Sequence, residues 1–306
     1  MAGGQRPSAS IERWNGEPGV VLSAGDYQAV FMPGLGMLGG SLRYQEVELV
    51  YLGGGLAGYR DGHQTGCPLL APWANRIAKR RFRVAGVDVD LRRVKLGTDE
   101  NRLPIHGTMT AQPGWEIVRL EPGALRARFD YGARADLLKA FPFPHTLDVA
   151  VAVSPGGLSV DVTLRPTGRR RVPVSFGWHP YLKVPGSRRS WQLELPARRH
   201  LELDAKSVPT GRSTPERAER QRLGDRTFDD GYALGRDRRF ALEGGGLRLT
   251  VRFGANYPFA QIFAPPRSRF VAVEPMTAPT NALVAGGCPV VRPGQRFTAS
   301  FNVSAE

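Results

Sequence analysis

The segment Phe270-Val-Ala-Val-Glu-Pro-Met-Thr-Ala-Pro-Thr-Asn-Ala-Leu283 carries a single carboxylate, Glu274, on an otherwise apolar run. Residues 270–273 are aromatic, β-branched or small, which predicts a buried β-strand. Pro275 has no N–H to donate and is expected to end that strand. Between Gly244 and Ala305 there is no other Asp or Glu, although the span holds six arginines. Glu274 is therefore a candidate functional acid, and a buried Glu–Arg pair is the alternative.

Short alternating runs of apolar and polar residues recur along the whole chain, separated by Gly, Pro and Asp, a pattern typical of half-buried strands joined by turns. With 37 glycines and 25 prolines the chain has little room for long helices. We expect short helices over 135–140 and 215–221, and a polar surface excursion over 198–226. The pattern predicts an all-β fold, an antiparallel β-sandwich or barrel. Strands are expected at 27–31, 46–51, 82–90, 124–129, 145–153 and 158–164.

Composition predicts one globular domain over residues 1–306, because all-β chains often form large single domains and no Gly/Ser/Pro-rich linker divides this one. No apolar run is long enough to span a bilayer, and the N-terminus lacks the apolar core of a signal peptide. We therefore expect a cytoplasmic protein with no membrane partner, as a monomer or homodimer. Cys67 and Cys288 lie outside any metal-ligand spacing and are expected to stay reduced.

The net charge of +14 raises nucleic acid as a partner. Only five of the 42 basic residues are Lys, and the arginines are dispersed along the chain. No basic block is interleaved with aromatic residues, as it would be in a protein that binds single strands. We expect no nucleic-acid partner.

A loop bounded by prolines contains Trp73, Asn75 and Arg76, ahead of the strand expected at 82–90. Asn and Arg offer donors suited to hydroxyl oxygens, and Trp offers a flat apolar face. Sugars use both kinds of contact. The alternative is an arginine that only closes backbone carbonyls within the loop.

Two histidines lie where a strand meets a loop. His106 precedes a Gly at a turn, and His179 lies in Gly177-Trp-His-Pro-Tyr181, where Pro180 favours an extended backbone. Each imidazole is a candidate proton donor or acceptor, and Trp178 and Tyr181 are candidate neighbours of a ligand. An incidental or carbonyl-bonded histidine is the alternative for both.

Asp229 and Asp230 precede a Gly in Thr227-Phe-Asp-Asp-Gly-Tyr-Ala-Leu234. Calcium would need more oxygen ligands than this region supplies, so we expect no metal. No phosphate-binding glycine loop or nucleophile elbow is present.

In this order and with these neighbours, the motifs resemble those of the aldose 1-epimerase (mutarotase) family, over roughly residues 20–303. The resemblance is most specific at Glu-Pro-Met-Thr. It implies a large antiparallel β-sandwich of the galactose mutarotase-like supersandwich type, a small-molecule sugar substrate and no cofactor. It implies that Glu274, ionised, is the base for the anomeric hydroxyl and that His179, charged, is the acid for the ring oxygen. The residues that would hold the sugar are Asn75, Arg76, His106, Trp178, Tyr181 and Asp229.

The resemblance leaves the exact function open, because Gly-Trp-His-Pro-Tyr replaces the family's commoner Asn-His-Ser-Tyr. An epimerase for free aldohexoses is the first hypothesis. Lys79-Arg80-Arg81 suggests a hexose 6-phosphate as the alternative substrate, because arginine forks suit phosphate. A carbohydrate-binding protein without turnover is the third hypothesis, since fold alone does not determine activity.

Overall fold

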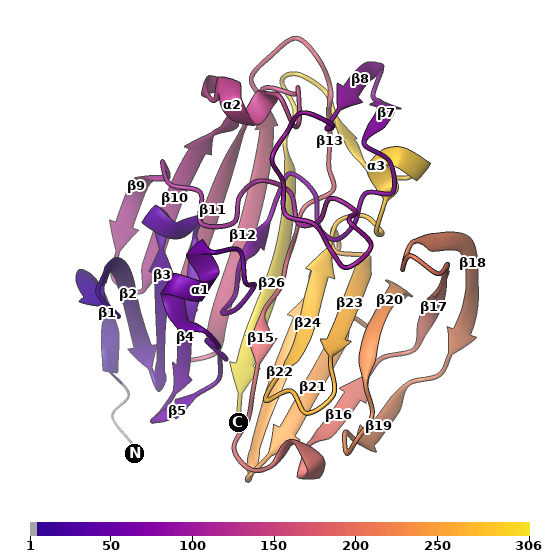
Figure 1. The fold of residues 1–306 in the computed structure, drawn as a ribbon. Helices are drawn as coiled ribbons and strands as arrows, with labels where there is room; N and C mark the ends of the chain where they lie inside the picture. Colours follow the sequence, from indigo (N-terminus) through magenta and orange to yellow (C-terminus); the bar gives the residue numbers. More distant parts are fainter. Residues whose placement is uncertain (1–4) are drawn as a thin grey trace.

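The structure of the protein is a computed structural model and describes residues 5–306. Its largest element is a nine-stranded antiparallel sheet that runs through the molecule (Figure 1). In spatial order, this sheet consists of β19 (Glu219–Arg222), β16 (Gln192–Leu195), β21 (Arg239–Gly244), β22 (Leu247–Phe253), β26 (Phe297–Ala305), β12 (Gly157–Pro166), β11 (His145–Ser154), β10 (Ala124–Asp130) and β9 (Glu116–Glu121).

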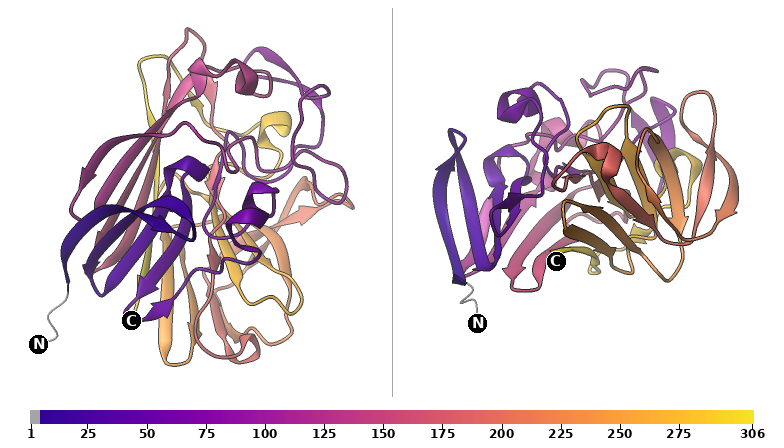
Figure 2. Two further views of the ribbon diagram at one scale, coloured as in Figure 1. Left: turned by 60° about the vertical axis from the view of Figure 1, so that its left-hand side comes forward. Right: turned by 90° about the horizontal axis from the view of Figure 1, so that it is seen from below.

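Two more antiparallel sheets pack on the nine-stranded sheet and complete the sandwich (Figure 2). The five-stranded sheet contacts β11 and β12, and the eight-stranded sheet reaches β26 through Trp178, whose ring lies 5.9 Å from that of Phe301. The five-stranded sheet contains β1 (Gln5–Trp14), β2 (Glu17–Gly25), β3 (Tyr27–Met32), β4 (Leu38–Tyr44) and β5 (Val47–Glu48). The eight-stranded sheet contains β18 (Pro209–Glu216), β17 (Arg198–Leu203), β20 (Phe228–Leu234), β23 (Phe259–Ala264), β24 (Val271–Met276), β14 (Gly177–Trp178) and β6 (Leu69–Leu70), with β15 (Tyr181–Leu182) also paired to β24.

The predicted alternation produces the core. Val151 of β11, Val160 of β12 and Phe301 of β26 are opposite one another in register and all are buried. Because side chains alternate between the two faces of a strand, such rows form a continuous apolar inner surface. Burying a side chain of this size contributes about 1.5–3 kcal/mol. The all-β prediction is confirmed.

The remaining elements are short. Strands β7 (Arg81–Val84) and β8 (Val87–Asp90) form a hairpin, and β13 (Val172–Pro173) pairs with β25 (Val290–Val291). The helices are α1 (Gly55–Arg60), α2 (Ala135–Leu138) and α3 (Ala282–Ala285), with 3₁₀ turns η1 (Pro33–Leu35), η2 (Tyr131–Ala133) and η3 (Arg188–Ser190). Among the described residues, no helix has the length and apolarity needed to cross a bilayer.

Two local expectations for the region 198–226 were wrong. Residues 215–221 are not helical, because β18 ends at Glu216 and β19 begins at Glu219. The region 198–226 contains strands, not only a surface excursion. Its strands β18 and β19 lie at sheet edges, where exposure of both faces removes the apolar alternation that marks a strand.

The strand that carries Glu274 does not stop before Pro275. It continues to Met276, which is paired with Gly177. On that side of β24 the ladder is interrupted between β14 and β15, so a proline is tolerated there. Elsewhere, expected and observed strands agree for β3, β10, β11 and β12, whereas 46–51 contributes only the two-residue β5 and 82–90 is split into the β7–β8 hairpin.

Candidate active site

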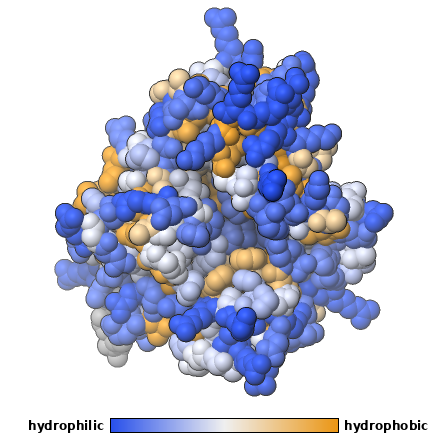
Figure 3. Space-filling model, in the orientation of Figure 1, coloured by the Kyte–Doolittle hydropathy of each residue, from blue (hydrophilic) through white to orange (hydrophobic). Residues whose placement is uncertain are grey.

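A cavity of about 930 Å³ lies against β23 and β24, and its lining includes most of the predicted site residues. The face seen in Figure 3 is hollowed near its centre, between mostly polar side chains. The walls of the cavity come from the turn after α1, the loop over 93–112 and the residues around α2. Glu274 and His179 line its inner end, with side chains only 2% and 6% exposed.

Glu274 and His179 face each other directly. Nε2 of His179 lies 3.1 Å from Oε1 of Glu274, because β24 presents the carboxylate beside the break between β14 and β15 where the histidine lies. The other two polar atoms, Oε2 of Glu274 and Nδ1 of His179, are buried and have no partner among the described residues. Buried groups left without a partner are costly, and a hydroxyl-bearing ligand offers them one.

Burial controls the charge of this pair. Desolvation raises the pKa of Glu274 well above its usual range, with a smaller contribution from the nearby Asp229. Desolvation also lowers the pKa of His179, and His106 adds to that effect. Both shifts favour the neutral forms, so a carboxylic acid that donates to a neutral imidazole is favoured over the charged pair implied by the family resemblance.

Aromatic neighbours hold the His179 ring. Tyr181 stacks on it with 4.3 Å between centroids and 6° between planes, and Phe263 meets it edge-on at 5.9 Å. Both residues line the cavity. Trp178 does not, contrary to expectation: its side chain points to the opposite face of the strand and is fully buried in the core. Successive residues of a strand point to opposite sides, so His179 and Trp178 cannot both face the ligand.

Two hydrogen bonds join Asn75 and His106. The backbone N–H of Asn75 donates to Nδ1 of His106 at 3.3 Å, and the backbone N–H of His106 donates to the carbonyl of Asn75 at 3.1 Å. Both residues have positive φ, 58° and 62°, a strain typical of functional sites. Burial lowers the pKa of His106 to about 3, so its ring is neutral. Because Nδ1 accepts a hydrogen bond, the ring proton lies on Nε2, as a donor.

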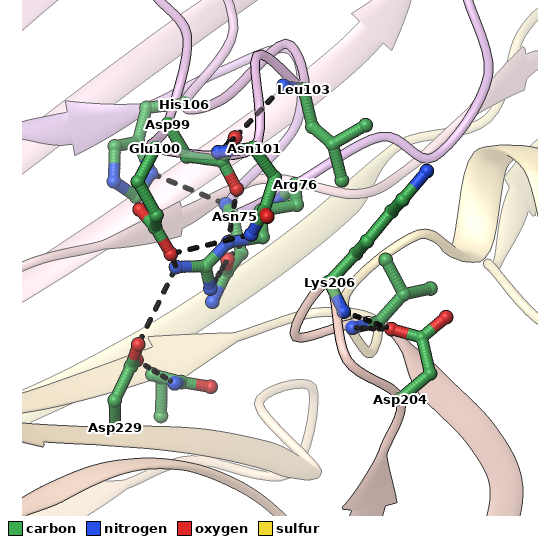
Figure 4. Close-up of polar contacts among 12 residues, drawn as sticks. Asn75, Arg76, Asp99, Glu100, Asn101, Leu103, His106, Asp204, Lys206 and Asp229 are labelled. Atoms are coloured by element: carbon green, nitrogen blue, oxygen red, sulfur yellow. Dashed lines mark hydrogen bonds and ion pairs between the residues drawn. The ribbon is translucent and has the colours of Figure 1, made fainter.

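Arg76 is surrounded by acceptors (Figure 4). Its Nε donates to Oδ2 of Asp99 at 2.7 Å, and one terminal nitrogen lies 3.4 Å from Asp229 and 3.5 Å from Glu100. Its other terminal nitrogen donates to Oδ1 of Asn75 at 3.2 Å. Three carboxylates therefore offset one cation, which makes this end of the cavity unfavourable for an anion and suitable for neutral hydroxyl groups.

The adjacent aspartates of β20 separate to opposite faces. Asp229 lines the cavity and accepts a hydrogen bond from Gln261 at 2.7 Å. Asp230 points away and lies 3.1 Å from Nε2 of His200, with Glu216 on the other side of that imidazole. Adjacent residues of a strand point to opposite faces. Asp229 therefore faces the cavity, and Asp230 faces away from it.

Sequence reasoning missed several lining residues. Gln261 is the one amide in the apolar strand Phe259-Ala-Gln-Ile-Phe-Ala264, a signal that could have been used. Asp99 follows no such pattern, and its role emerges only from its contact with Arg76. The segment Lys79-Arg80-Arg81 does not line the cavity; the basic side chains that do, at its outer end, are Arg60, Arg93, Lys95 and Lys139.

Comparison with known proteins places this site in context. A family model described as aldose 1-epimerase matches residues 40–304. None of the curated protein sequences matches the chain.

Similar folds occur among solved structures that share little sequence with the chain. A galactose mutarotase-like protein from Clostridium acetobutylicum has a TM-score of 0.84 at 16% identity, over 98% of this chain and 99% of that one. A putative aldose 1-epimerase from Escherichia coli K12 has a TM-score of 0.77 at 17% identity, over 98% of this chain and 99% of that one. A galactose 1-epimerase from Lactobacillus acidophilus NCFM has a TM-score of 0.78 at 12% identity, also over 98% of this chain and 99% of that one.

Proposed function

The chain belongs to the aldose 1-epimerase family, and from this premise we propose that it is an isomerase that interconverts the α and β anomers of an aldohexose. The observation that carries the proposal is the 3.1 Å contact between Glu274 and His179 at the inner end of a polar cavity. Opening a hemiacetal removes a proton from one oxygen and delivers one to another. Both oxygens are bonded to the same carbon, so the acid and the base must lie close together.

The shared proton of this pair fits the reaction. In the charged form, Glu274 accepts the proton of the anomeric hydroxyl while His179 protonates the ring oxygen, and the pair becomes neutral. The bond between the anomeric carbon and the ring oxygen breaks, and the anomeric carbon becomes a carbonyl. Rotation about the C1–C2 bond then presents the other face of this carbonyl. Ring closure on the other face of the carbonyl reverses both transfers. The charged and neutral forms carry the same number of protons and differ only in where they lie. Burial in the protein favours the neutral form, and sugar hydroxyls that bond to the carboxylate would stabilise the charged form.

The remaining groups orient the sugar. His106 supplies a neutral N–H donor, Arg76 a fixed cation, and Asp229 an acceptor for hydroxyl groups. Tyr181 keeps the His179 ring in place by stacking. The reaction transfers two protons and breaks and re-forms the bond between the anomeric carbon and the ring oxygen, without any change of oxidation state, so the chemistry calls for acid and base groups.

Polarimetry of freshly dissolved α-D-glucose and α-D-galactose tests the proposal. The protein is expected to accelerate the approach to the equilibrium rotation. Because one acid or base group contributes roughly 10²–10⁴-fold, Glu274→Gln should slow the catalysed rate at least about a hundredfold. Glu116→Gln, which removes an exposed carboxylate of β9, is the matched control and should keep the full rate.

Two results would contradict the proposal. Full activity in Glu274→Gln would show that the base lies elsewhere. Saturable sugar binding by the unmodified protein without any acceleration would instead support a carbohydrate-binding protein.

A hexose 6-phosphate is the second candidate substrate, and the outer end of the cavity favours it. Arg93, Lys95 and Lys139 line that end, are exposed, and form no ion pair among residues 5–306. A phosphate on the carbon farthest from the anomeric centre would point toward them when the anomeric end is innermost. If this is the substrate, Lys95→Ala/Lys139→Ala should raise KM for glucose 6-phosphate while leaving glucose unaffected. Equal KM changes for both sugars would contradict a phosphate contact.

A further inference from the structure

A second cavity, of about 620 Å³, lies apart from the candidate active site. Three surface segments line it: 183–191 after β15, 224–225, and the turn 267–269 before β24. The two cavities share no lining residue, although they flank the same strand, since Tyr181 lines the first and Lys183 the second. The charged residues of the second cavity are one carboxylate, Asp225, and five cations, Lys183, Arg188, Arg189, Arg267 and Arg269.

Two of the five cations already have partners. Arg188 donates to the carbonyl oxygens of Gly224 and Arg226, which ties two of the segments together. Arg189 lies 3.1 Å from Asp225 in an ion pair.

The other three cations, Lys183, Arg267 and Arg269, make no ion pair or side-chain hydrogen bond in the described part of the chain. Their charges converge on one concave surface and repel one another there. Clefts lined by one sign of charge concentrate ions of the opposite sign.

The backbone turn before β24 fixes where Arg267 lies in this cavity. Arg267 is the third residue of a turn that is closed by a hydrogen bond of 3.1 Å from the N–H of Ser268 to the carbonyl of Pro265. Its φ is 60°, a conformation that glycine and asparagine adopt much more readily than arginine. Replacement of Arg267 by glycine therefore removes the charge without straining the turn.

We propose that this second cavity is a binding site for a phosphate group, either the free ion or a phosphate monoester. Guanidinium forks match the oxygens of a tetrahedral oxyanion, and a lysine adds a compact positive charge. A nucleic-acid strand would need an exposed aromatic surface for stacking. Trp191, the one aromatic residue in the lining, is buried and donates its indole N–H to Pro185 at 3.1 Å.

Calorimetric titration with inorganic phosphate and with glycerol phosphate, at low ionic strength, tests the proposal. Arg267→Gly removes one cation and also relieves the positive φ, so the variant should keep or exceed the melting temperature of the unmodified protein. Its phosphate affinity should fall about tenfold or more, as expected for the loss of a charge-assisted hydrogen bond. Arg269→Ala should weaken binding to a similar degree.

Arg102→Gly is the matched control. Arg102 is also an exposed arginine with φ near 60° (59°), but it lines neither cavity, so its replacement should leave phosphate affinity unchanged. Unchanged affinity in Arg267→Gly, or equal losses in both glycine variants, would overturn the proposal. So would binding that is lost in Lys95→Ala/Lys139→Ala, because it would belong to the active-site cavity. Tighter binding of inorganic phosphate identifies the free ion as the ligand, and tighter monoester binding identifies a phosphorylated metabolite. Equal affinity supports recognition of the phosphate group alone.

Discussion

Replacement of Asp99 by Asn should destabilise the protein far more than the same change at its neighbour Glu100, although both carboxylates contact Arg76. Asp99 has a side chain only 1% exposed, with Oδ2 at 2.7 Å from Nε of Arg76. Its Oδ1 accepts the backbone N–H groups of Asn101 and Leu103 at 2.9 and 2.8 Å. Asp99 therefore joins the arginine to the loop that leads to His106, which lines the candidate active site.

The magnitude follows from these contacts. Asparagine has one carbonyl oxygen, which can serve either Arg76 or the two loop N–H groups, and its amide donors then face donors. Losing a charge-assisted hydrogen bond costs about 1.5–3 kcal/mol, and breaking a buried ion pair costs about 3–5 kcal/mol. Because Arg76 keeps Asp229 and Glu100, we expect about 2–3 kcal/mol for Asp99→Asn. The side chain of Glu100 is 68% exposed, and its Oε1 lies 3.5 Å from a terminal nitrogen of Arg76. Glu100→Gln should therefore lower the free energy of unfolding by less than about 1 kcal/mol.

Urea unfolding followed by tryptophan fluorescence measures both variants, and an unchanged slope with denaturant validates the comparison. Asp99→Asn should also raise KM for the sugar, since Arg76 loses its orientation. Equal free energies of unfolding for the two variants would refute the argument, because burial would then have no influence on these two ion pairs.

Three further predictions concern single residues. Burial raises the pKa of Glu274, so the folded protein keeps a proton that the unfolded chain releases above the ordinary pKa of 4.5. As pH rises above this value, the free energy of unfolding of the unmodified protein should fall relative to that of Glu274→Gln. The expected decrease, measured by urea unfolding at a series of pH values, is up to about 1.4 kcal/mol per pH unit. Asp229→Asn should lower sugar turnover in polarimetry, whereas Asp230→Asn, which faces His200, should not. Gly107 has φ +68°, and a Cβ there would lie 2.1 Å from the carbonyl oxygen of Ala71. Gly62 also has positive φ, +96°, but a Cβ there would contact nothing. In urea unfolding, Gly107→Ala should therefore lower the free energy of unfolding by about 2 kcal/mol or more beyond the decrease in Gly62→Ala.

The fold class could be predicted from the local alternation of apolar and polar residues. Residues that alternate in hydrophobicity along 145–153 and 158–164 can bury one face only as strands, because the side-chain period of a strand is two. That is why β11 and β12 lie where expected. The same reasoning failed over 215–221, where edge strands expose both faces and the alternation disappears.

The sequence by itself also identified the candidate acid and base. Glu274 is conspicuous because a carboxylate is costly inside an apolar strand, and His179 because a proline follows it. Neither inference needs coordinates.

Only the tertiary structure decided which neighbours share the cavity. It placed Trp178 in the core and Asp229, not Asp230, in the cavity lining. It also showed that Lys95 and Lys139, and not Lys79-Arg80-Arg81, line this cavity. The physical reason is that strand phase, loop path and distance between segments far apart in the chain arise from packing of the three sheets. A sequence pattern reports the environment of a residue, whereas the partner that sets its pKa is known only when the chain has folded.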